Sequence, residues 1–234
     1  MLRLYVPGVR AGDAQVRIEG PELRHLRTVR LTPGARLRVL DDAGGEHDVV
    51  LERLGAREAV GRVLASHHPV RESPLELVLA PALLKGAKMD LVVEKATELG
   101  VHRLAPVTTA RVVGEGAPLE RWRRIAVAAA KQSGRSRVPT VDAPVPLDTL
   151  ARAPWPGLRL VPWEQEDGRR LDALPDRAGA VVAVVGPEGG LADDEIGLLR
   201  AHQFVPITLG PRILRAETAV LAVAAHCQRR WGDG

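Results

Sequence analysis

The sequence predicts an α/β protein in which a small β-barrel precedes a larger domain built on a parallel sheet. Before residue 70, apolar and polar residues alternate in short segments that Gly, Pro and Asp interrupt. Farther along, nearly continuous Val, Leu and Ala runs alternate with helical patterns, which is typical of strands buried on both faces of a parallel sheet. We therefore expect a barrel at residues 1–70 and an α/β domain at residues 71–234.

The barrel is expected to be antiparallel and to contain one short helix rich in arginine. That helix is predicted at residues 21–31, and residues 67–74 (HHPVRESP) are interpreted as a linker. Five segments carry the alternation of half-buried strands: 2–7, 14–20, 35–42, 46–54 and 58–66.

The second domain is expected to alternate strands and helices. Ligands of such sheets bind beyond the carboxyl ends of the strands, so the loops that leave the strands are the places to look for a site. The predicted strands are 75–81, 103–108, 158–162, 180–187 and 205–210. The predicted helices are 88–100, one around Trp122 that ends near Ser133, a short one around Leu171, 192–203 and 215–231.

Composition excludes several classes of protein. Apolar residues make up 45% of the 234-residue chain, which excludes a disordered or fibrous protein. The longest apolar runs are shorter than the roughly 20 residues that a membrane span needs. There is no apolar export signal near Met1, and the one cysteine, Cys227, lies in an apolar pattern that suits a buried side chain in a reducing compartment. We expect a cytoplasmic protein.

The charge is basic but moderate, and its distribution is more informative than its size. The chain has 33 Lys and Arg residues against 29 Asp and Glu residues, a formal net charge of +4. A charge of this size alone does not indicate nucleic-acid binding. However, only four of the basic residues are lysines, and the arginines cluster. Codon bias explains an excess of arginine but not its clustering.

Two arginine clusters are candidate RNA contacts. Arg24, Arg27 and Arg30 recur every third residue, which on a short helix places them on one face. A solvated basic face explains this spacing as well as a phosphate site does. Arg135 and Arg137 follow the predicted end of the Trp122 helix, and we expect them to project from a loop where they can bind phosphate or carboxylate.

Two glycine-bearing loops in the last quarter of the chain indicate a ligand pocket. GPEGG at residues 186–190 and LGPRILRAETA at residues 209–219 each leave a predicted strand and precede a helical pattern. Glycine permits close approach of the backbone, and Asp193 or Asp194 is expected to cap the helix after the first loop. One such loop alone could be a tight turn without a ligand. Two of them can clasp a flat apolar ring such as adenine.

Other familiar site motifs do not occur. The sequence contains neither GxxxxGK[ST] nor a GxGxxG that follows a strand, so the usual phosphate-binding loops are excluded. GxSxG and HExxH are also missing. His67 and His68 lack metal-ligand spacing to another His or Cys, and we expect no metal site.

The chain resembles the ribosomal RNA small-subunit methyltransferase E family of the SPOUT superfamily. The two glycine loops carry the resemblance, and four more segments agree in order: HLRTVRLTPG at 25–34, RESPLEL at 71–77, LLKGAKMDLVVEKATELGV at 83–101 and AAKQSGRSRVP at 129–139. The resemblance implies a PUA-like, RNA-binding barrel at residues 1–70. It further implies a SPOUT domain at residues 71–234 with a deep trefoil knot, a site for S-adenosylmethionine and a homodimer interface. The implied reaction is methylation of N3 of one uridine in 16S ribosomal RNA.

The resemblance also assigns site residues by position. Arg111 lies in TTARVV at residues 108–113, where the family often has an acidic-Arg-Ser signature, and is expected to keep a basic, RNA-binding role. Leu191 and Ala192 replace the commoner Phe-Ser after GPEGG. The implied cofactor-binding residues are Val161, Pro162, Trp163, Val185, Gly186, Pro187, Gly189, Leu209, Gly210, Ile213, Leu214 and Arg215.

Four residues are candidates for the chemistry of this reaction. Uridine N3 becomes a good nucleophile only when its proton leaves, so the enzyme must stabilise a developing anion. Arg215 is the leading candidate because its guanidinium can bind a uracil carbonyl, and Arg30 or Arg135 is expected to reach the base or its phosphate. Glu188 is a candidate proton acceptor, although a Glu in a glycine turn often binds backbone amides instead. Glu217 is expected to be a buried partner of Arg215.

Two other functions stay open from the sequence. A non-catalytic RNA-binding factor for ribosome assembly would keep the arginine clusters, and a small-molecule enzyme would use the glycine loops for a phosphorylated ligand. The exact uridine, the general base, the dimer geometry and the choice between naked RNA and an assembled subunit are not determined by the sequence.

Overall fold

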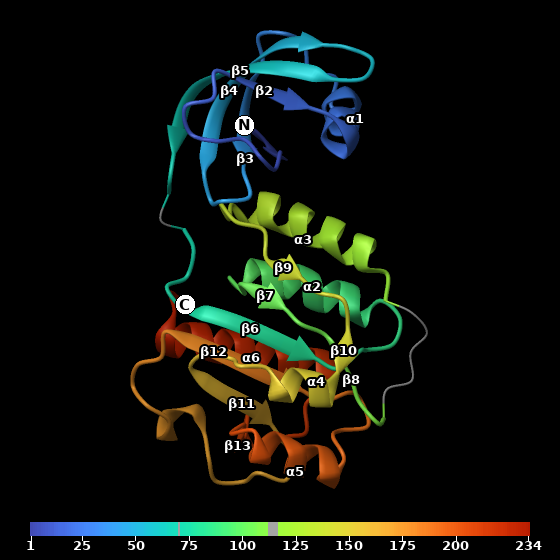
Figure 1. Cartoon of the computed structure of the whole chain (residues 1–234), viewed down its shortest axis with the longest axis vertical. Coiled ribbons are helices and arrows are strands. Elements are labelled where there is room, and N and C mark those ends of the chain that lie inside the picture. Colours follow the sequence, from blue (N-terminus) through green and yellow to red (C-terminus); the bar gives the residue numbers. More distant parts are fainter. Residues whose placement is uncertain (70, 112–116) are drawn as a thin grey trace. The chain divides into compact units, whose positions relative to one another are not determined.

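The chain divides into two compact units. The computed structural model describes residues 1–69, 71–111 and 117–234 (Figure 1). The first unit comprises Met1–Glu72 together with Ala130–Val138, and the second comprises Ser73–Ala129 and Pro139–Gly234. A linear boundary near residue 70 therefore does not account for residues 130–138, which join the first unit from far along the sequence. Val112 and Val113 of the TTARVV segment lie outside the described residues.

The first unit is built on a five-stranded sheet in the order β1-β3-β4-β5-β2. Strands β3, β4, β5 and β2 pair antiparallel, but β1 pairs parallel with β3, so the expectation of a purely antiparallel sheet is wrong. A parallel pair needs a long connection, and β2 and a helix supply it between β1 and β3. The strands are β1 (Leu2–Tyr5), β2 (Gln15–Ile18), β3 (Arg36–Leu40), β4 (Glu46–Leu54) and β5 (Ala59–His67).

Helix α1 (Gly20–Thr28) is shorter than the arginine pattern predicts. Leu23 and Leu26 anchor it in the core of the first unit. The helix ends before Arg30, which has a positive φ of 54°. Its N–H donates to the carbonyl of Arg27 at 3.0 Å, and the N–H of Leu31 donates to that of Leu26 at 3.3 Å, the bonding pattern that commonly ends a helix at a glycine. Arg30 is therefore not on the helical face that carries Arg24 and Arg27.

The second unit is an α/β domain with a parallel sheet, as predicted. Its main sheet has the order β13-β11-β12-β6-β7-β9, and every pairing in it is parallel. The predicted strand at 103–108 is divided, since β8 pairs with β10 in a separate two-stranded sheet. The strands are β6 (Glu76–Pro81), β7 (Arg103–Leu104), β8 (Val107–Thr108), β9 (Thr140–Val141), β10 (Val145–Pro146), β11 (Leu158–Pro162), β12 (Ala180–Val185) and β13 (Val205–Ile207).

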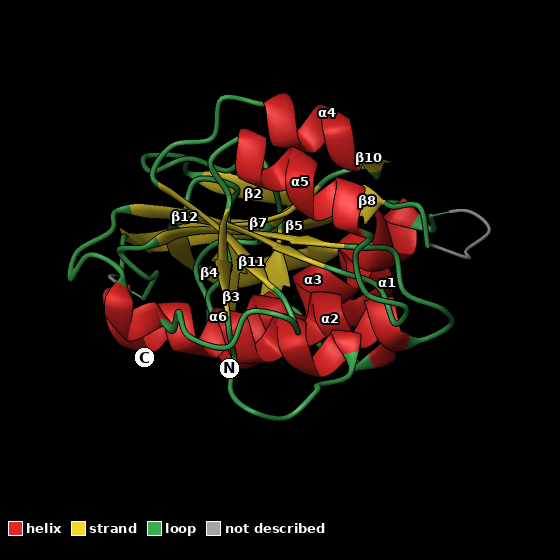
Figure 2. Cartoon of the chain, turned by 90° about the horizontal axis from the view of Figure 1, so that it is seen from below, coloured by secondary structure: helices red, strands yellow, loops and turns green. Residues whose placement is uncertain are grey.

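Helices cover both faces of the main sheet. Figure 2 shows α4 (Leu147–Arg152) and α5 (Asp193–Ala201) on one side, and α2 (Lys88–Glu98) and α6 (Ala216–Trp231) on the other. Because both faces are covered, the central strand β12 is apolar throughout, and five of its six residues are buried. Helix α3 (Leu119–Ser133) ends at Ser133, and a single turn, Leu171–Ala173, forms where a short helix was expected. The sequence pattern missed α4, β9 and β10.

Candidate active site

A cavity of about 590 Å³ opens at the carboxyl edge of the main sheet in the second unit. Pro162 of β11 pairs with Ile207 of β13, and Leu160 pairs with Ala183 of β12, so three strands end at nearly the same level. Loops that leave these strands form the walls. The lining residues are Lys88, Pro162, Trp163, Glu164, Val185, Gly186, Pro187, Glu188, Gly189, Gly190, Leu191, Thr208, Leu209, Gly210, Pro211, Arg212, Ile213, Leu214, Arg215, Ala216 and Ala219.

The GPEGG loop presents its backbone to the cavity. Gly190 has a φ of +71°, and its N–H donates to the carbonyl of Pro187 at 2.9 Å, which closes the turn. A Cβ on Gly190 would lie 2.6 Å from Oε1 of Glu164, and one on Gly186 would lie 3.0 Å from the Leu191 side chain. Larger residues at these two positions would intrude on neighbouring groups, so the loop depends on glycine.

The second loop combines a fixed turn with an exposed apolar wall. The Thr208 hydroxyl donates to the carbonyl of Gly210 and accepts from its N–H, both at 3.2 Å, while Gly210 has a φ of +118°. Ile213 is 87% exposed although it is large and apolar. Arg215 is exposed and takes the N-cap position of α6. The loop thus leads from an apolar wall directly to a cation.

Among the charged residues that line the cavity are Lys88, Glu188 and Arg215, and Glu217 lies beside Lys88; we name these four the cavity-mouth cluster. The Lys88 Nζ donates to Oε1 of Glu188 at 2.8 Å and lies 3.7 Å from Oε2 of Glu217. Glu217 therefore has Lys88 as its ion-pair partner, where the sequence suggested Arg215. Burial works to raise the pKa of Glu188, but the hydrogen bond and the charge of Lys88, together with backbone hydrogen bonds, outweigh it and hold that pKa below its ordinary value. A lowered pKa makes Glu188 a poor proton acceptor.

Arg111 binds the GPEGG loop directly, and the carboxylate of Glu195, which was not expected from the sequence, holds the segment before it. Its guanidinium donates to the carbonyl of Gly189 at 2.7 Å. Glu195, only 9% exposed, accepts the N–H of Ala110 and the N–H of Ala192, each at 2.8 Å. Glu195 thus ties the segment before Arg111 to the start of α5. It stands three residues after the N-cap, the place of the acidic residue in a capping box.

The cap expected at the start of α5 is therefore wrong. The N-cap residue is Ala192, whose methyl group accepts no hydrogen bond, and Asp193 and Asp194 lie inside the helix. The Glu195 carboxylate reaches back to the Ala192 N–H and satisfies one of the free donors of the first turn. A Glu five residues after GPEGG is a sequence signal that could have indicated this arrangement.

Most of the residues that the resemblance assigns to the cofactor line this cavity. Val161 does not: it is completely buried in the core beneath α4 and α5. Its neighbour Pro162 begins the wall instead. The assigned residues that line the cavity are Pro162, Trp163, Val185, Gly186, Pro187, Gly189, Leu209, Gly210, Ile213, Leu214 and Arg215. Lys88, Glu164 and Thr208 line it too and were not expected.

The predicted RNA contacts of the first unit fall into two groups. Arg24, Arg27, Arg30 and Arg137 are exposed, and the guanidinium of Arg27 donates to the carbonyl of Gly55 at 2.6 Å. Because α1 ends at Thr28, Arg30 lies in the turn after the helix and not on the helix itself.

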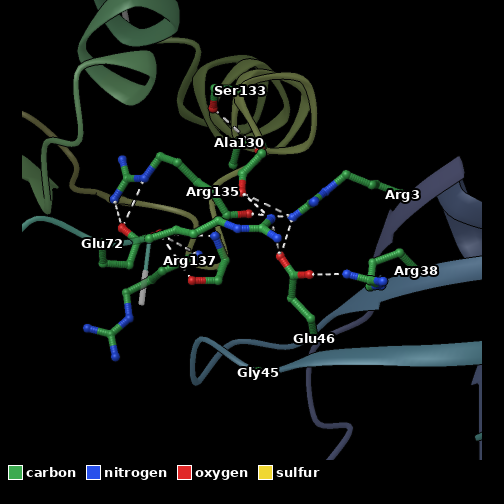
Figure 3. Close-up of polar contacts among 12 residues, drawn as sticks. Arg3, Arg38, Gly45, Glu46, Glu72, Ala130, Ser133, Arg135 and Arg137 are labelled. Atoms are coloured by element: carbon green, nitrogen blue, oxygen red, sulfur yellow. Dashed lines mark hydrogen bonds and ion pairs between the residues drawn. The ribbon is translucent and has the colours of Figure 1, made fainter. Parts of the chain in front are cut away.

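Arg135 does not project from a loop, and that expectation is wrong. It is 4% exposed, and its guanidinium binds Oε2 of Glu72 through Nη2 at 2.6 Å and Nε at 3.1 Å (Figure 3). Oε1 of Glu72 also accepts the N–H groups of Ser136 and Arg137, each at 3.0 Å. A buried cation needs such a paired carboxylate, and the acidic residue of the expected linker provides it. The Arg137 side chain points away from this pair in Figure 3.

The described part of the chain has neither a cluster suited to a metal ion nor a helix suited to a membrane. Among residues 1–69, 71–111 and 117–234, no group of three or more His, Cys, Asp or Glu side chains is arranged to hold a metal ion. No helix within the same ranges combines the length and apolar character of a bilayer span.

Comparison with known proteins places the chain in a family. A family model for an RNA methyltransferase domain matches residues 71–228. The chain belongs to the RNA methyltransferase family. The ribosomal RNA small subunit methyltransferase E of Synechocystis sp. is 34% identical over 232 residues, which cover 96% of this chain and 76% of that protein. Its namesake from Mycobacterium bovis is 35% identical, with 97% of this chain and 92% of that protein covered.

Solved structures of similar proteins agree with this family. A ribosomal RNA small subunit methyltransferase E from Neisseria gonorrhoeae, bound to S-adenosyl methionine, is 33% identical with a TM-score of 0.93, covering 100% of this chain and 99% of that chain. A Legionella pneumophila protein in complex with the cofactor SAM is 30% identical with a TM-score of 0.90, covering 100% of this chain and 99% of that chain. Both likenesses extend over the two units.

Proposed function

We propose that this chain uses S-adenosylmethionine to methylate N3 of one uridine in 16S ribosomal RNA. The observation that carries the proposal is the cavity at the carboxyl edge of the sheet, where two glycine loops meet a cationic mouth in a member of the RNA methyltransferase family. The named relatives and the Neisseria structure with its bound S-adenosyl methionine support it. Ribosomal RNA as substrate agrees with a cytoplasmic location.

The residues of the cavity fit this cofactor. Its volume of about 590 Å³ lies within the usual range of small-ligand sites, about 300–1,000 Å³. Ile213 offers an apolar surface that a bound ring would cover. Trp163, another wall residue, has a buried Nε1 without a hydrogen-bond partner among the described residues, which is costly unless a ligand supplies one. The backbones of the two glycine loops and the side chains of Trp163 and Ile213 would hold the cofactor.

The chain's own residues have three tasks in the reaction. When bound, S-adenosylmethionine supplies a methyl group on a positively charged sulfur, which keeps the electron pair of the broken carbon–sulfur bond. The loop residues must orient uracil N3 toward that methyl group and exclude water. Arg215 is exposed at the cavity wall, and its guanidinium donates hydrogen bonds to a uracil carbonyl as N3 loses its proton. Glu188 is better suited to hold Lys88 than to take the proton.

RNA binding is assigned to exposed arginines rather than to aromatic stacking. Phe, Trp and Tyr make up only 3% of the chain, so phosphate contacts must provide most of the affinity. Arg24, Arg27, Arg30 and Arg137 are exposed and fit this role. The left-handed conformation of Arg30 costs roughly 1–2 kcal/mol, which supports a functional need for its side chain. Arg111 would bind the RNA beside the GPEGG loop.

The finer architecture is proposed from the resemblance. The first unit would be a PUA-like barrel, the second would contain a deep trefoil knot, and two copies of the chain would form a homodimer. The domains at 1–70 and 71–234 would bind RNA and carry out the methyl transfer, with residues 130–138 packed in the first unit. Light scattering after size exclusion tests the homodimer: a monomeric mass at micromolar concentration would contradict it.

The test of the function combines cofactor binding with mapping of methylated bases. We expect S-adenosylmethionine to bind in calorimetry, and a strain that lacks the gene to lose one N3-methyluridine from 16S ribosomal RNA. Gly190→Val should abolish both binding and rescue, because the φ of +71° at this position is a conformation that a β-branched residue rarely adopts. Gly197→Ala is the matched control, since a Cβ on Gly197 meets nothing within 4 Å.

The outcomes distinguish this function from its alternatives. RNA binding without cofactor binding would identify a non-catalytic assembly factor. Cofactor binding with an unchanged set of methylated bases in the deletion strain would exclude 16S ribosomal RNA as the substrate.

A further inference from the structure

Lys88 occupies an unusual position for a surface lysine. It is the first residue of α2 and lines the cavity, while its side chain is 37% exposed. Two carboxylates from other elements hold it: Glu188 comes from the GPEGG loop after β12, and Glu217 comes from the first turn of α6. Lys88 therefore links the start of one helix to both segments that shape the cavity.

The contacts of Lys88 are incomplete. An ammonium has three donors, and within the described residues only Glu188 accepts a hydrogen bond from Nζ. Oε2 of Glu217 is buried without a hydrogen bond in the same part of the chain, at 3.7 Å from Nζ. The hydrogen bond to Glu188 raises the pKa of Lys88, while the nearby charge of Arg215 works in the opposite direction. Lys88 is thus a cation that Glu188 holds in place and that can still donate further hydrogen bonds.

Lys95 provides the contrast on the same helix. Its Nζ donates to Glu94 at 2.7 Å and to Glu98 at 2.9 Å, and both carboxylates belong to α2 itself. It does not line the cavity. Two lysines on one helix therefore have different surroundings: one forms local surface pairs, and the other is held at the cavity mouth by residues distant in the sequence.

We propose that Lys88 is a second cation of the methyl transfer and binds one uracil carbonyl while Arg215 binds the other. This inference rests on the proposed function. Uracil N3 gives its proton to water and uses the freed electron pair to form the bond to the methyl carbon, while the pair of the broken carbon–sulfur bond stays on sulfur. Before that bond forms, the charge of the deprotonated imide is shared by two carbonyl oxygens. Two cations at one cavity mouth match this distribution.

Glu188 and Glu217 are then positioning residues. Their carboxylates hold the flexible lysine side chain at the mouth, which lowers the entropy lost when it contacts the base. Arrival of the uracil oxygen replaces the weaker, longer contact to Glu217 before the short hydrogen bond to Glu188. The lowered pKa of Glu188 keeps its carboxylate ionised for this task at neutral pH.

The test compares Lys88→Gln, Lys88→Arg and the control Lys95→Gln in the full-length protein. Single-turnover methyl transfer to 16S ribosomal RNA is measured against pH, and S-adenosylmethionine affinity is measured by calorimetry. Loss of one charge-stabilising donor typically costs about 100-fold or more in rate. We expect a deficit of that size for Lys88→Gln at pH 7, with wild-type cofactor affinity. The difference in rate between Lys88→Gln and the wild type should become smaller as pH rises, because hydroxide then removes the N3 proton without assistance from a cation.

The outcomes separate this inference from the function on which it rests. Partial recovery in Lys88→Arg and an unchanged Lys95→Gln would support the second cation. A wild-type rate for Lys88→Gln would overturn it, and so would a deficit that is equal at every pH and accompanied by lost cofactor affinity. A wild-type protein that methylates no uridine would instead overturn the proposed function.

Discussion

Two charged clusters of the molecule use the same kinds of residue in opposite ways. In the first unit, Glu46 is 1% exposed at its side chain and pairs with Arg3 at 2.6 Å and with Arg38 (Figure 3). It also pairs with Arg71 at 3.1 Å. We name these four residues the Glu46 cluster. In the second unit, the cavity-mouth cluster leaves Lys88 37% exposed and one oxygen of Glu217 without a hydrogen bond among the described residues.

The difference indicates which cluster stabilises the fold and which is available for chemistry. Both oxygens of Glu46 are bound by guanidinium groups, so a ligand could reach it only by breaking ion pairs in a buried place. The cavity-mouth cluster has free donors and access to solvent. A buried carboxylate with both oxygens bound fixes its neighbours, whereas a partly exposed cation beside a carboxylate oxygen that has no hydrogen bond among the described residues can bind a substrate.

The largest effect is expected when the cavity-mouth cluster loses its arginine. Arg215→Ala should lower methyl transfer about 100- to 1,000-fold, because a donor to the developing negative charge is lost. The unfolding midpoint should stay close to wild type because Arg215 is exposed, and cofactor affinity should do so because the loop backbones, Trp163 and Ile213 would hold the cofactor. Rate measurements and calorimetry check this.

The control for that variant lies on the same helix. Arg229 is exposed near the end of α6 and does not line the cavity, so Arg229→Ala should be fully active. Wild-type turnover in Arg215→Ala would end the assignment.

The next effect concerns stability and should appear in the Glu46 cluster. Glu46→Gln should lower the free energy of unfolding by about 3 kcal/mol, because three guanidinium groups lose their shared counter-charge. Urea denaturation measures it. Glu58→Gln is the matched control: Glu58 pairs with Arg53 at 2.6 Å and Arg17 at 3.1 Å near the surface, where such pairs contribute about 0–1 kcal/mol. Equal losses in the two variants would contradict the contrast between buried and surface pairs.

The carboxylate of Glu46 should also make the stability of the protein depend on pH. Burial works to raise the pKa of Glu46, but hydrogen bonds from Arg38 and Arg3 outweigh it and lower that pKa below its ordinary 4.5. A lowered folded-state pKa contributes stability that is complete above the unfolded pKa and is lost as pH falls through the folded value. We therefore expect wild-type stability to fall below about pH 4. Glu46→Gln should have a smaller slope in that range, and identical slopes would refute the assignment.

A smaller effect is expected at the carboxylate that positions Arg111. Glu195→Ala should destabilise the protein by about 1–2 kcal/mol, since two backbone N–H groups lose their acceptor. Methyl transfer should fall by roughly tenfold as Arg111 loses its position beside Gly189. Asp193→Ala should change neither quantity, because Asp193 is not the cap. A larger loss in Asp193→Ala than in Glu195→Ala would restore the cap that the sequence suggested.

The smallest effect separates an exposed arginine from a buried one. Arg24→Ala should weaken RNA binding only a few-fold and reduce the salt slope by about 1, as expected for one phosphate contact. Arg135→Ala should lower stability, because Oε2 of Glu72 loses the guanidinium that binds it through two nitrogens, and should leave the salt slope unchanged. Filter binding between about 50 and 200 mM salt measures both slopes. Affinity that does not vary with salt in the wild type would contradict binding by arginines altogether.

The sequence alone was sufficient for the α/β class and for most of the cavity wall. The apolar runs that became β11, β12 and β13 are local signals, and each is followed directly by its loop, so placing the loops at one edge needed only the rule for parallel sheets. GPEGG and LGPRILRAETA could likewise be predicted to form turns, because glycine and proline determine the backbone conformation at their own positions. The sequence did not show that Val161 is buried in the core while Pro162 lines the cavity, because successive residues of a strand point to opposite faces and the sequence does not say which residue borders the cavity.

Only the tertiary structure decided which charges meet. Arg135 and Glu72 are 63 residues apart, Lys88 and Glu188 are 100 apart, and Ala110 and Glu195 are 85 apart. Whether a cation is buried and paired or exposed and available depends on such distant partners, and no local pattern contains them. Arg135 and Arg137 look alike in the sequence, yet the fold buries one against Glu72 and leaves the other exposed. Residue type determined what each group can do, and the fold determined which of them can do it.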